Sequence, residues 1–284
     1  MKKIRFIKSS SMFVEKEITE YFHQPYEQFI KMFLPEGEYE LVEENESADI
    51  CFYSVQLEDE NILRSNELNI FLSIENFSHW GHYKHMNKFG RYGCKSTNIY
   101  ISNDESEIKY VRNMKIIPVI LCRINYFNNM IPILTNNIPF EKKKFLLITS
   151  KNWHNKNKID LIKKLEKHGK IDHISMYPQL NNKTCYHGSE LIHIYNQYKF
   201  VMAFENSHSD GYITEKIFNV FLSKSIPIYD GAPDINKYIN PKSYIKYDEN
   251  IEKKITILNN ENVYNKVINE EKVNSNYKNL KLEY

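Results

Sequence analysis

Short apolar runs alternate with amphipathic segments through the second half of the chain, and this alternation constrains the fold more than any other feature. We predict helices over Ile159–Lys167, Glu190–Tyr198 and Thr214–Ser223, and strands at FLLITS, near Ile174, at KFVMAF and at SIPIYDG. Strands that are apolar along nearly their whole length are typical of parallel sheets covered by helices on both faces. The second half is therefore predicted to be an open α/β sheet, which binds ligands at the carboxyl ends of its strands.

The first half contains further β-branched and aromatic runs bounded by turn residues: IRFI, YELV, ADICFYSV, NIFLSI, NIYIS and MKIIPVIL. Such runs predict strands. Between the first two, apolar residues at near-helical spacing predict a helix over Ile18–Leu34, which Pro35 and Gly37 end. The first half is therefore also predicted to open as a β-α-β unit.

A polar, Asn-rich stretch with Pro132 and Pro139 separates the two halves. We therefore predict two domains, an N-terminal one over residues 1–138 and a C-terminal one over residues 139–250. Residues 251–284 are predicted to form a C-terminal helix and tail, whose apolar residues either pack back on a domain or form a partly ordered terminus.

Charge and hydropathy argue against several functional classes. Lys and Arg total 38 against 36 Asp and Glu, a net charge of +2, so no global positive field attracts nucleic acid. The apolar runs are far shorter than the about 20 residues that cross a membrane, so we predict no transmembrane segment, with peripheral membrane contact still open. Cys51, Cys94, Cys122 and Cys185 lack disulfide or metal spacing, which favours free thiols and a cytoplasmic, soluble or peripheral protein.

The segment over residues 198–244 carries the clearest chemical pattern. Thr214 suits a helix N-cap, which places Glu215 and Lys216 in the first helical turn after a loop that contains Gly211. Free amides at a helix N-terminus attract an anion, and a lysine in the same turn adds a full charge. A carboxylate beside a phosphate accepts hydrogen bonds from sugar hydroxyls. The pattern suits a nucleotide sugar, and an ordinary capped, solvated helix is the alternative.

The same segment contains AFENS, then YITEKI, then IPIY with a following Gly, and in this it resembles the α-1,3/4-fucosyltransferases of glycosyltransferase family ten. The resemblance implies an α/β fold of the GT-B type, with two Rossmann-like domains whose parallel sheets face each other across a cleft. It further implies that the second domain binds the donor GDP-fucose and that the first binds the acceptor.

The resemblance also assigns donor-binding residues. Asn206, Tyr212, Glu215 and Lys216 match positions that line the GDP-fucose site in the family, with Lys216 at the pyrophosphate and Glu215 at sugar or ribose hydroxyls. Glu205 lies in the same motif, and an acidic side chain close to a pyrophosphate is costly. We therefore expect Glu205 to turn away from the donor or to meet a cation, and its role stays open.

A second segment, TSKNWHNKNKIDLIKKL, resembles the family's Ser-Asn loop and the Arg-headed helix that follows it, with Ser150 as the Ser and Leu165 as the closing Leu. Lys158 stands at the Arg position and is implied to contact the donor pyrophosphate. A lysine keeps the charge but loses the bidentate fork, so we expect weaker donor binding. Lys156, His154 or a merely solvated loop are the alternatives.

Fucose transfer with inversion requires a group that removes the proton of the acceptor hydroxyl. After NIFLSI, the segment IENFSHWG resembles the family's Glu-Ser-Pro-Ser-His by its Glu75, Ser78 and His79. The resemblance makes Glu75 the catalytic base, although Asn76 and Phe77 replace the Ser-Pro pair. An ordinary solvated glutamate is the alternative.

Aromatic and imidazole side chains follow Glu75 and are candidates for the acceptor site. His79, Trp80 and Tyr83 offer ring faces and hydrogen-bonding edges of the kind on which a carbohydrate stacks, and a buried aromatic core is the alternative. A spacing of three residues spreads histidines around a helix, which argues against a metal cluster. We predict no metal site and no required cofactor.

Together these inferences predict an inverting, α-1,3-fucosyltransferase-like glycosyltransferase. It moves L-fucose from GDP-fucose to a hydroxyl of a glycan acceptor, with O3 of GlcNAc or a related sugar as the family expectation. The alternatives are a transferase for another GDP-deoxyhexose and an inactive member that binds a nucleotide sugar or a glycan.

Overall fold

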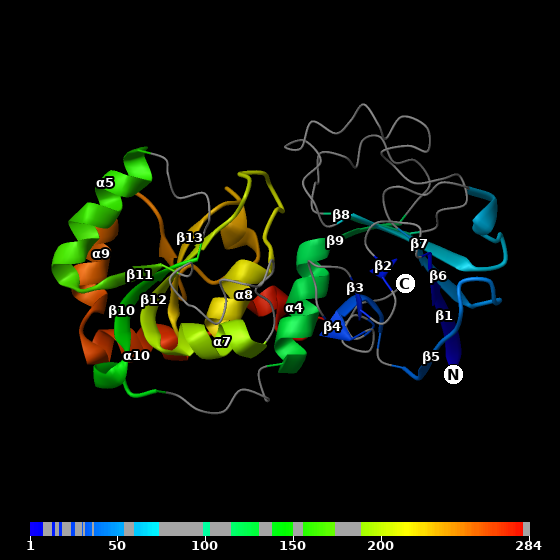
Figure 1. Cartoon of the computed structure of the whole chain (residues 1–284), viewed down its shortest axis with the longest axis horizontal. Coiled ribbons are helices and arrows are strands. Elements are labelled where there is room, and N and C mark those ends of the chain that lie inside the picture. The colour runs from blue at the N-terminus through cyan, green and yellow to red at the C-terminus, as the bar shows by residue number, and fades with distance from the viewer. Residues whose placement is uncertain are drawn as a thin grey trace. The chain divides into compact units, whose positions relative to one another are not determined.

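The computed structural model describes residues 1–7, 13–14, 17–18, 24–25, 30, 32–35, 37–53, 60–73, 99–102, 115–130, 138–149, 156–173 and 189–280 (Figure 1). Contacts divide the chain into two compact units. Unit 1 holds residues 1–126, 209–212 and 280–284, and unit 2 holds residues 127–208 and 213–279. The division falls at Tyr126–Phe127, whereas we predicted the domain boundary at residue 138, and residues 251–279 are part of unit 2.

Unit 1 contains a six-stranded sheet in the order β5-β1-β6-β7-β8-β9. Every adjacent pair of strands is parallel. Each sequence run predicted as a strand in the first half overlaps one of these strands, which are β1 Lys2–Phe6, β5 Tyr39–Leu41, β6 Ile50–Tyr53, β7 Leu68–Ser73, β8 Ile99–Ser102 and β9 Lys115–Pro118.

The predicted helix over Ile18–Leu34 is wrong at its start. Glu17–Ile18 is strand β3 and Gln24–Pro25 is strand β4, and together with β2 (Phe13–Val14) they form a small antiparallel sheet. Pro25 gives the physical reason, because proline has no amide hydrogen and its ring clashes with the preceding turn of a helix.

The run MKIIPVIL was predicted as one strand, and this is wrong for its second half. Strand β9 ends at Pro118, and helix α4 (Val119–Met130) begins at the next residue. Proline is well suited to a helix start, since its fixed φ is already helical and no amide is lost there. The apolar side chains of Val119, Cys122 and Phe127 are buried along α4, so the stretch that we read as an interdomain break from Asn125 is helical at first.

Unit 2 confirms the predicted open α/β sheet. Its five strands lie in the order β11-β10-β12-β13-β14, and each adjacent pair is parallel. The chain builds outward from β10 to β11 and then returns to β12 on the other side of β10. The direction of winding therefore reverses between β10 and β12, and open α/β sheets bind ligands at the carboxyl ends of such strands. The strands are β10 Lys144–Ile148, β11 Ile171–His173, β12 Tyr198–Phe204, β13 Ile226–Asp230 and β14 Ile245–Lys246.

The three helices predicted for this half all form, with slightly different ends. Tyr198, which we placed in a helix, is the first residue of β12, and the strand expected near Ile174 is β11, which ends at His173. The helices of unit 2 are α5 Lys156–Leu165, α7 Ser189–Asn196, α8 Glu215–Leu222, α9 Ile251–Leu258 and α10 Glu261–Asn269.

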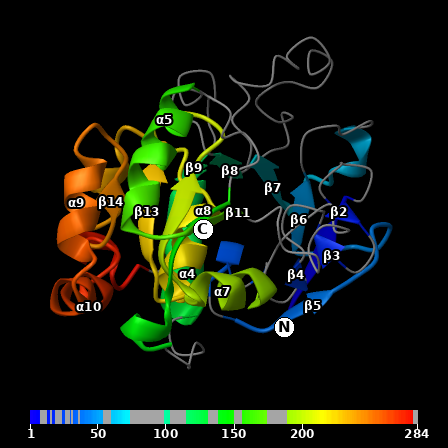
Figure 2. The same ribbon diagram turned by 60° about the vertical axis from the view of Figure 1, so that its left-hand side comes forward.

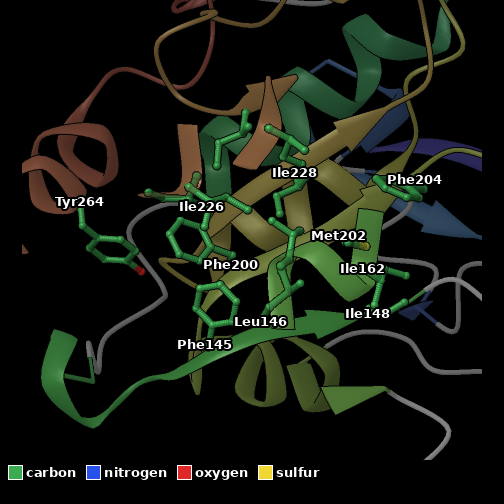
Figure 3. Packing of buried hydrophobic residues seen from close by; sticks show 14 residues of the cluster. Phe145, Leu146, Ile148, Ile162, Phe200, Met202, Phe204, Ile226, Ile228 and Tyr264 are labelled. Atoms are coloured by element: carbon green, nitrogen blue, oxygen red, sulfur yellow. The ribbon is translucent and has the colours of Figure 1, made fainter. Parts of the chain in front are cut away.

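Helices cover both faces of the sheet in unit 2. Side chains of α5, α9 and α10 share one hydrophobic cluster with alternate residues of β10, β12 and β13, while α7 and α8 pack on the opposite side (Figures 1 and 2). In the cluster the Phe200 ring packs edge-on against Phe145, with centroids 5.7 Å apart, and against Tyr264 at 6.2 Å (Figure 3). The C-terminal helices are therefore part of this core.

Two further predictions concern cysteine and membranes. Cys51 and Cys122 are buried free thiols, as predicted, and burial raises the pKa of each to about 12. Within the ranges that the structure describes, no helix is both long enough and apolar enough to cross a membrane.

Candidate functional site

Most of the predicted site residues of unit 2 follow β10 and β12, the two strands at which the winding reverses. Asn206 is the second residue after the end of β12, and the same loop leads to α8 with Glu215 and Lys216. Lys158 lies in the first turn of α5, the helix that follows β10. The topology therefore gathers these residues at one edge of the sheet, the edge where α/β proteins bind ligands.

Thr214 caps α8 as the sequence predicted. Its backbone is extended, with φ −100° and ψ −171°, and its hydroxyl oxygen accepts from the Lys216 amide at 3.5 Å. Gly211 in the preceding loop has φ 75°, in the left-handed region that favours glycine. The loop and the start of the helix thus have the local geometry that the residue types demand.

Lys216 is held close to three oxygen atoms. Its ammonium nitrogen lies 3.0 Å from the Thr214 hydroxyl, 3.3 Å from Glu205 Oε2 and 3.4 Å from Glu215 Oε1. The side chain of Lys216 is 28% exposed and that of Glu215 is 38% exposed. A cation and a carboxylate therefore reach solvent together at the N-terminus of α8.

Glu205, whose role the sequence left open, is buried. Its Oε1 accepts from the Thr214 amide at 2.7 Å, and its Oε2 accepts from the Thr214 hydroxyl at 2.6 Å. The carboxylate thus turns into the protein and also meets a cation, Lys216. Of the two alternatives that we expected for Glu205, contact with a cation is observed.

The other two predicted donor residues differ in exposure. Asn206 is exposed, so its amide is available to a ligand. Tyr212 is buried, with 3% of its surface accessible, and its amide donates to the Ser209 carbonyl at 3.1 Å. The loop therefore presents Asn206 outward and packs Tyr212 inward.

Sequence reasoning missed a histidine–aspartate pair at this edge. His208 Nε2 lies 2.8 Å from Asp230 Oδ1, and the imidazole is 55% exposed while the carboxylate is only 18% exposed. Both residues come at the carboxyl ends of neighbouring strands, since Phe204 of β12 is in register with Asp230 of β13. The pairing depends on the register of β12 against β13, which the sequence pattern does not specify.

Thr149 and Tyr195 add neutral hydroxyls near the end of β10. The Thr149 hydroxyl donates to the Met202 carbonyl at 2.5 Å and so ties β10 to β12. Burial raises the pKa of Tyr195, an effect that its hydrogen bond with Thr149 opposes and that the Glu215 charge adds to. The phenol is therefore un-ionised at neutral pH.

The remaining predicted residues lie outside the described part of the chain. These are Glu75, His79, Trp80 and Tyr83, together with the side chain of Lys158. Strand β7, which precedes Glu75 in the sequence, ends at Ser73. Among the residues that the structure does describe, no three His, Cys, Asp or Glu side chains are grouped to hold a metal ion.

Comparison with known proteins points to one family. Residues 138–266 match the family model of the C-terminal part of glycosyltransferase family 10 (fucosyltransferase). Over 50 residues the chain is 50% identical to alpha-(1,3)-fucosyltransferase FucT of Helicobacter pylori, and the matched segment covers 18% of this chain and 10% of that protein. Over 107 residues it is 30% identical to GDP-fucose protein O-fucosyltransferase 3 of Xenopus laevis, covering 33% of this chain and 23% of that protein. The matched segments are thus a small part of these relatives.

The fold is similar to that of a solved enzyme of this kind. A crystal structure of alpha1,3-fucosyltransferase superposes with a TM-score of 0.58 and 19% identity over 99% of this chain and 85% of the other. The predicted fold class, with two Rossmann-like α/β regions built on parallel sheets as in GT-B proteins, is confirmed by the two sheets and by this likeness. The arrangement of the two sheets across a cleft stays a prediction.

Proposed function

Through residues 138–266 the chain belongs to glycosyltransferase family 10, the fucosyltransferases, and from this premise we propose that it transfers L-fucose from GDP-fucose to a hydroxyl of a glycan acceptor. In this reaction the acceptor oxygen forms a bond to C1 of fucose as the bond from C1 to the phosphate oxygen breaks. GDP leaves with the electron pair of that bond, and the configuration at C1 is inverted. O3 of GlcNAc or of a related sugar is the acceptor position that we favour.

The observation that carries the proposal is the pair of helices that begin at the carboxyl edge where the winding reverses. The N-terminus of α8 presents Lys216 beside the Thr214 cap, and the first turn of α5 contains Lys156 and Lys158 and no acidic residue. A lysine in the first turn of a helix is unfavourable for its dipole unless an anion offsets it. The first turn of α5 has no acidic residue, whereas Lys216 of α8 lies beside Glu205 and Glu215. Two helix N-termini at one edge, each with a lysine, suit the diphosphate of GDP.

Each donor residue has a role in the proposal. Lys216 and Lys158 bind the diphosphate and offset the charge that GDP gains as it leaves. The Glu215 carboxylate, which is 38% exposed, accepts hydrogen bonds from ribose or fucose hydroxyls. Asn206 and Tyr212 line the same site, Asn206 from the exposed side of the loop and Tyr212 from its buried side.

The acceptor side of the proposal rests on the sequence. Glu75 takes the proton of the acceptor hydroxyl, and His79, Trp80 and Tyr83 bind the acceptor sugar. Lysines and helix amides are sufficient to neutralise GDP, so we propose that no metal ion is required.

A polypeptide hydroxyl is a second candidate acceptor. It is favoured by the 30% identity with a GDP-fucose protein O-fucosyltransferase over 107 residues. Transfer from another GDP-deoxyhexose is a further alternative, because phosphate and ribose contacts do not identify the sugar. The last alternative is an inactive protein that binds a nucleotide sugar or a glycan.

The test is a transfer assay on the purified chain. GDP-fucose is supplied with GlcNAc-, Glc- and Gal-terminated acceptors and with folded Ser/Thr-containing peptides, each with and without EDTA, and GDP release is measured together with product mass. We expect one acceptor class to gain the mass of one fucose, and we expect EDTA to leave the rate of transfer unchanged. We also expect Glu75→Gln to abolish turnover and to leave GDP binding intact. GDP binding without product on every acceptor would favour the inactive alternative.

The compartment is part of the proposal. Two of the four cysteines, Cys51 and Cys122, are free and buried, which suits the reducing cytoplasm. Alkylation of the native and the denatured protein, followed by mass spectrometry, would count the free thiols, and a disulfide in protein isolated from cells would contradict this location.

A further inference from the structure

Glu205 carries a charge in a place where a charge is costly. Its side chain is 0% exposed, and a buried ion is tolerated only where hydrogen bonds and opposite charges satisfy it. Both carboxylate oxygens bind the same residue, Thr214, which is the N-cap of α8. The two bonds span the whole loop between β12 and α8, so they fix where the helix begins relative to the strand.

The same carboxylate also holds the lysine of the proposed donor site. Lys216 Nζ lies 3.3 Å from Glu205 Oε2 and 3.0 Å from the Thr214 hydroxyl, which itself donates to Glu205. Glu205, Thr214 and Lys216 therefore form one connected network. A lysine side chain loses considerable rotamer entropy when it is fixed, and this network fixes Lys216 before any anion binds.

Strand β13 shapes the space for Glu205 from the other side. The Glu205 amide donates to the Asp230 carbonyl at 2.8 Å, so the residue is anchored at the end of the sheet. A Cβ at Gly231 would lie 2.4 Å from Glu205 Cγ and 2.5 Å from the Tyr229 hydroxyl oxygen. That hydroxyl in turn accepts from the Ala232 amide at 3.0 Å. Glycine at position 231 is what leaves room for the glutamate.

We propose that Glu205 is a positioning residue of the donor site, which aligns the Lys216 ammonium for a nucleoside diphosphate without touching it. The proposal rests on the proposed function, since it assumes that this edge binds GDP. The proposal predicts whether neutralisation of Glu205 strengthens or weakens the binding of GDP. A carboxylate that acted only as a nearby negative charge would repel the diphosphate, so its neutralisation would strengthen binding. A positioning carboxylate has the opposite effect, because its neutralisation releases Lys216 and weakens binding.

The test is a double-mutant cycle on GDP affinity, measured by calorimetry. Glu205→Gln keeps the shape of the side chain and places an amide group where Oε2 accepts, and we expect the dissociation constant for GDP to rise about fivefold to tenfold. In a Lys216→Met background the same change should raise it by less than twofold, because the group being positioned is gone. A purely structural role for Glu205 would weaken binding equally in both backgrounds.

Tyr198→Phe is the matched control. It removes a buried hydroxyl that donates to the Asp172 carboxylate at 2.8 Å, at the opposite end of the same strand β12. We expect it to lower the thermal midpoint and to leave the GDP dissociation constant unchanged. Should Glu205→Gln fail to fold, Thr214→Val removes only the bridging hydroxyl and should raise the constant about threefold.

The outcomes separate the two proposals. If the wild-type chain does not bind GDP, the proposed function fails and takes this inference with it. If the wild type binds GDP and the Glu205→Gln variant binds it equally well or more tightly, the positioning role is wrong and the proposed function stands. The same conclusion follows if Glu205→Gln weakens GDP binding to the same degree in the wild-type and Lys216→Met backgrounds.

Discussion

The polar groups at the two ends of the neighbouring strands β12 and β13 differ in how far they are used up by the protein. At the amino end the bonds stay within the protein: the Tyr198 hydroxyl donates to Asp172, and the Ser225 hydroxyl lies 2.7 Å and 2.6 Å from the carbonyls of Tyr195 and Tyr198. At the carboxyl end titratable side chains gather, and some of them reach solvent. These are Glu205, His208, Lys216 and Asp230.

This difference separates groups that stabilise the fold from groups that are available to a ligand. The charged groups at the amino end are bound by the protein itself, since Asp172 pairs with Lys144 and Lys143 Nζ donates to the carbonyls of Asn196 and Lys224. At the carboxyl end a cation and an imidazole stay partly exposed although partners for them lie nearby. Substitutions at the amino end should therefore change the free energy of unfolding, and substitutions at the carboxyl end should change GDP binding.

The largest effect is expected for Lys216→Met. A hydrogen bond to a charged group contributes about 1.5–3 kcal/mol, so the GDP dissociation constant should rise about thirtyfold. Calorimetry measures the constant on the folded variant, and the thermal midpoint should fall as well, because the buried Glu205 carboxylate loses its cation. Lys242→Met, at an exposed lysine of unit 2, is the matched control and should bind GDP as the wild type does. Equal losses in both variants would remove the distinction between the two ends.

Gly231→Ala should affect both stability and binding. The added methyl group meets Glu205 Cγ and the Tyr229 hydroxyl, and such overpacking costs about 1–3 kcal/mol. Urea unfolding measures the loss of stability, and calorimetry should show weaker GDP binding because Glu205 is displaced. At Gly37 a Cβ would meet the Tyr39 ring at 3.3 Å, so Gly37→Ala is a milder control. A Gly231→Ala protein with unchanged stability and affinity would show that the carboxyl end is loosely packed.

Tyr198→Phe should lower the free energy of unfolding by about 1 kcal/mol, the usual contribution of a hydrogen bond. Urea unfolding is the measurement, and the GDP dissociation constant of the folded protein should not change. A shift in that constant would mean that the two ends of β12 are coupled, which is the opposite of the account given above.

The last prediction concerns pH. Burial, with the Lys224 charge as a second cause, lowers the pKa of Lys143 from 10.5 to about 8. Between these values the unfolded chain holds a proton that the folded chain has lost, so the free energy of unfolding should rise with pH from about 8 towards 10. Burial of Lys272, with a pKa of about 8, acts in the same direction. Urea midpoints at pH 7.5, 8.5 and 9.5 should show a shallower rise in Lys143→Met, and identical slopes would contradict the lowered pKa.

The sequence predicted the second sheet well because local and tertiary signals agree there. Its strands are apolar on both faces, and Thr214 is both a good cap and the residue that the buried Glu205 binds. The prediction of a helix over Ile18–Leu34 was wrong because it rested on apolar spacing and did not take account of Pro25, which is incompatible with a helix interior. The strand predicted over MKIIPVIL failed in the same way, since Pro118 marks the change from β9 to α4.

The contacts of the candidate site were predictable only in part. Residue types at the start of α8 indicated an anion site, because capping and the helix dipole are local effects. The pairing of His208 with Asp230 and the buried position of Glu205 depend on the register of β12 against β13, which no local pattern specifies. The motif located Glu205, and only the three-dimensional packing shows what it binds.

Hydrogen–deuterium exchange of the whole chain with and without GDP shows directly at which end of the sheet GDP binds. We predict slower exchange in the presence of GDP for amides of residues 205–218, at the carboxyl end of β12 and the start of α8. We predict no change for residues 223–228, at the amino end of β13. Protection at the amino end, or saturating GDP with no protection at residues 205–218, would contradict this prediction.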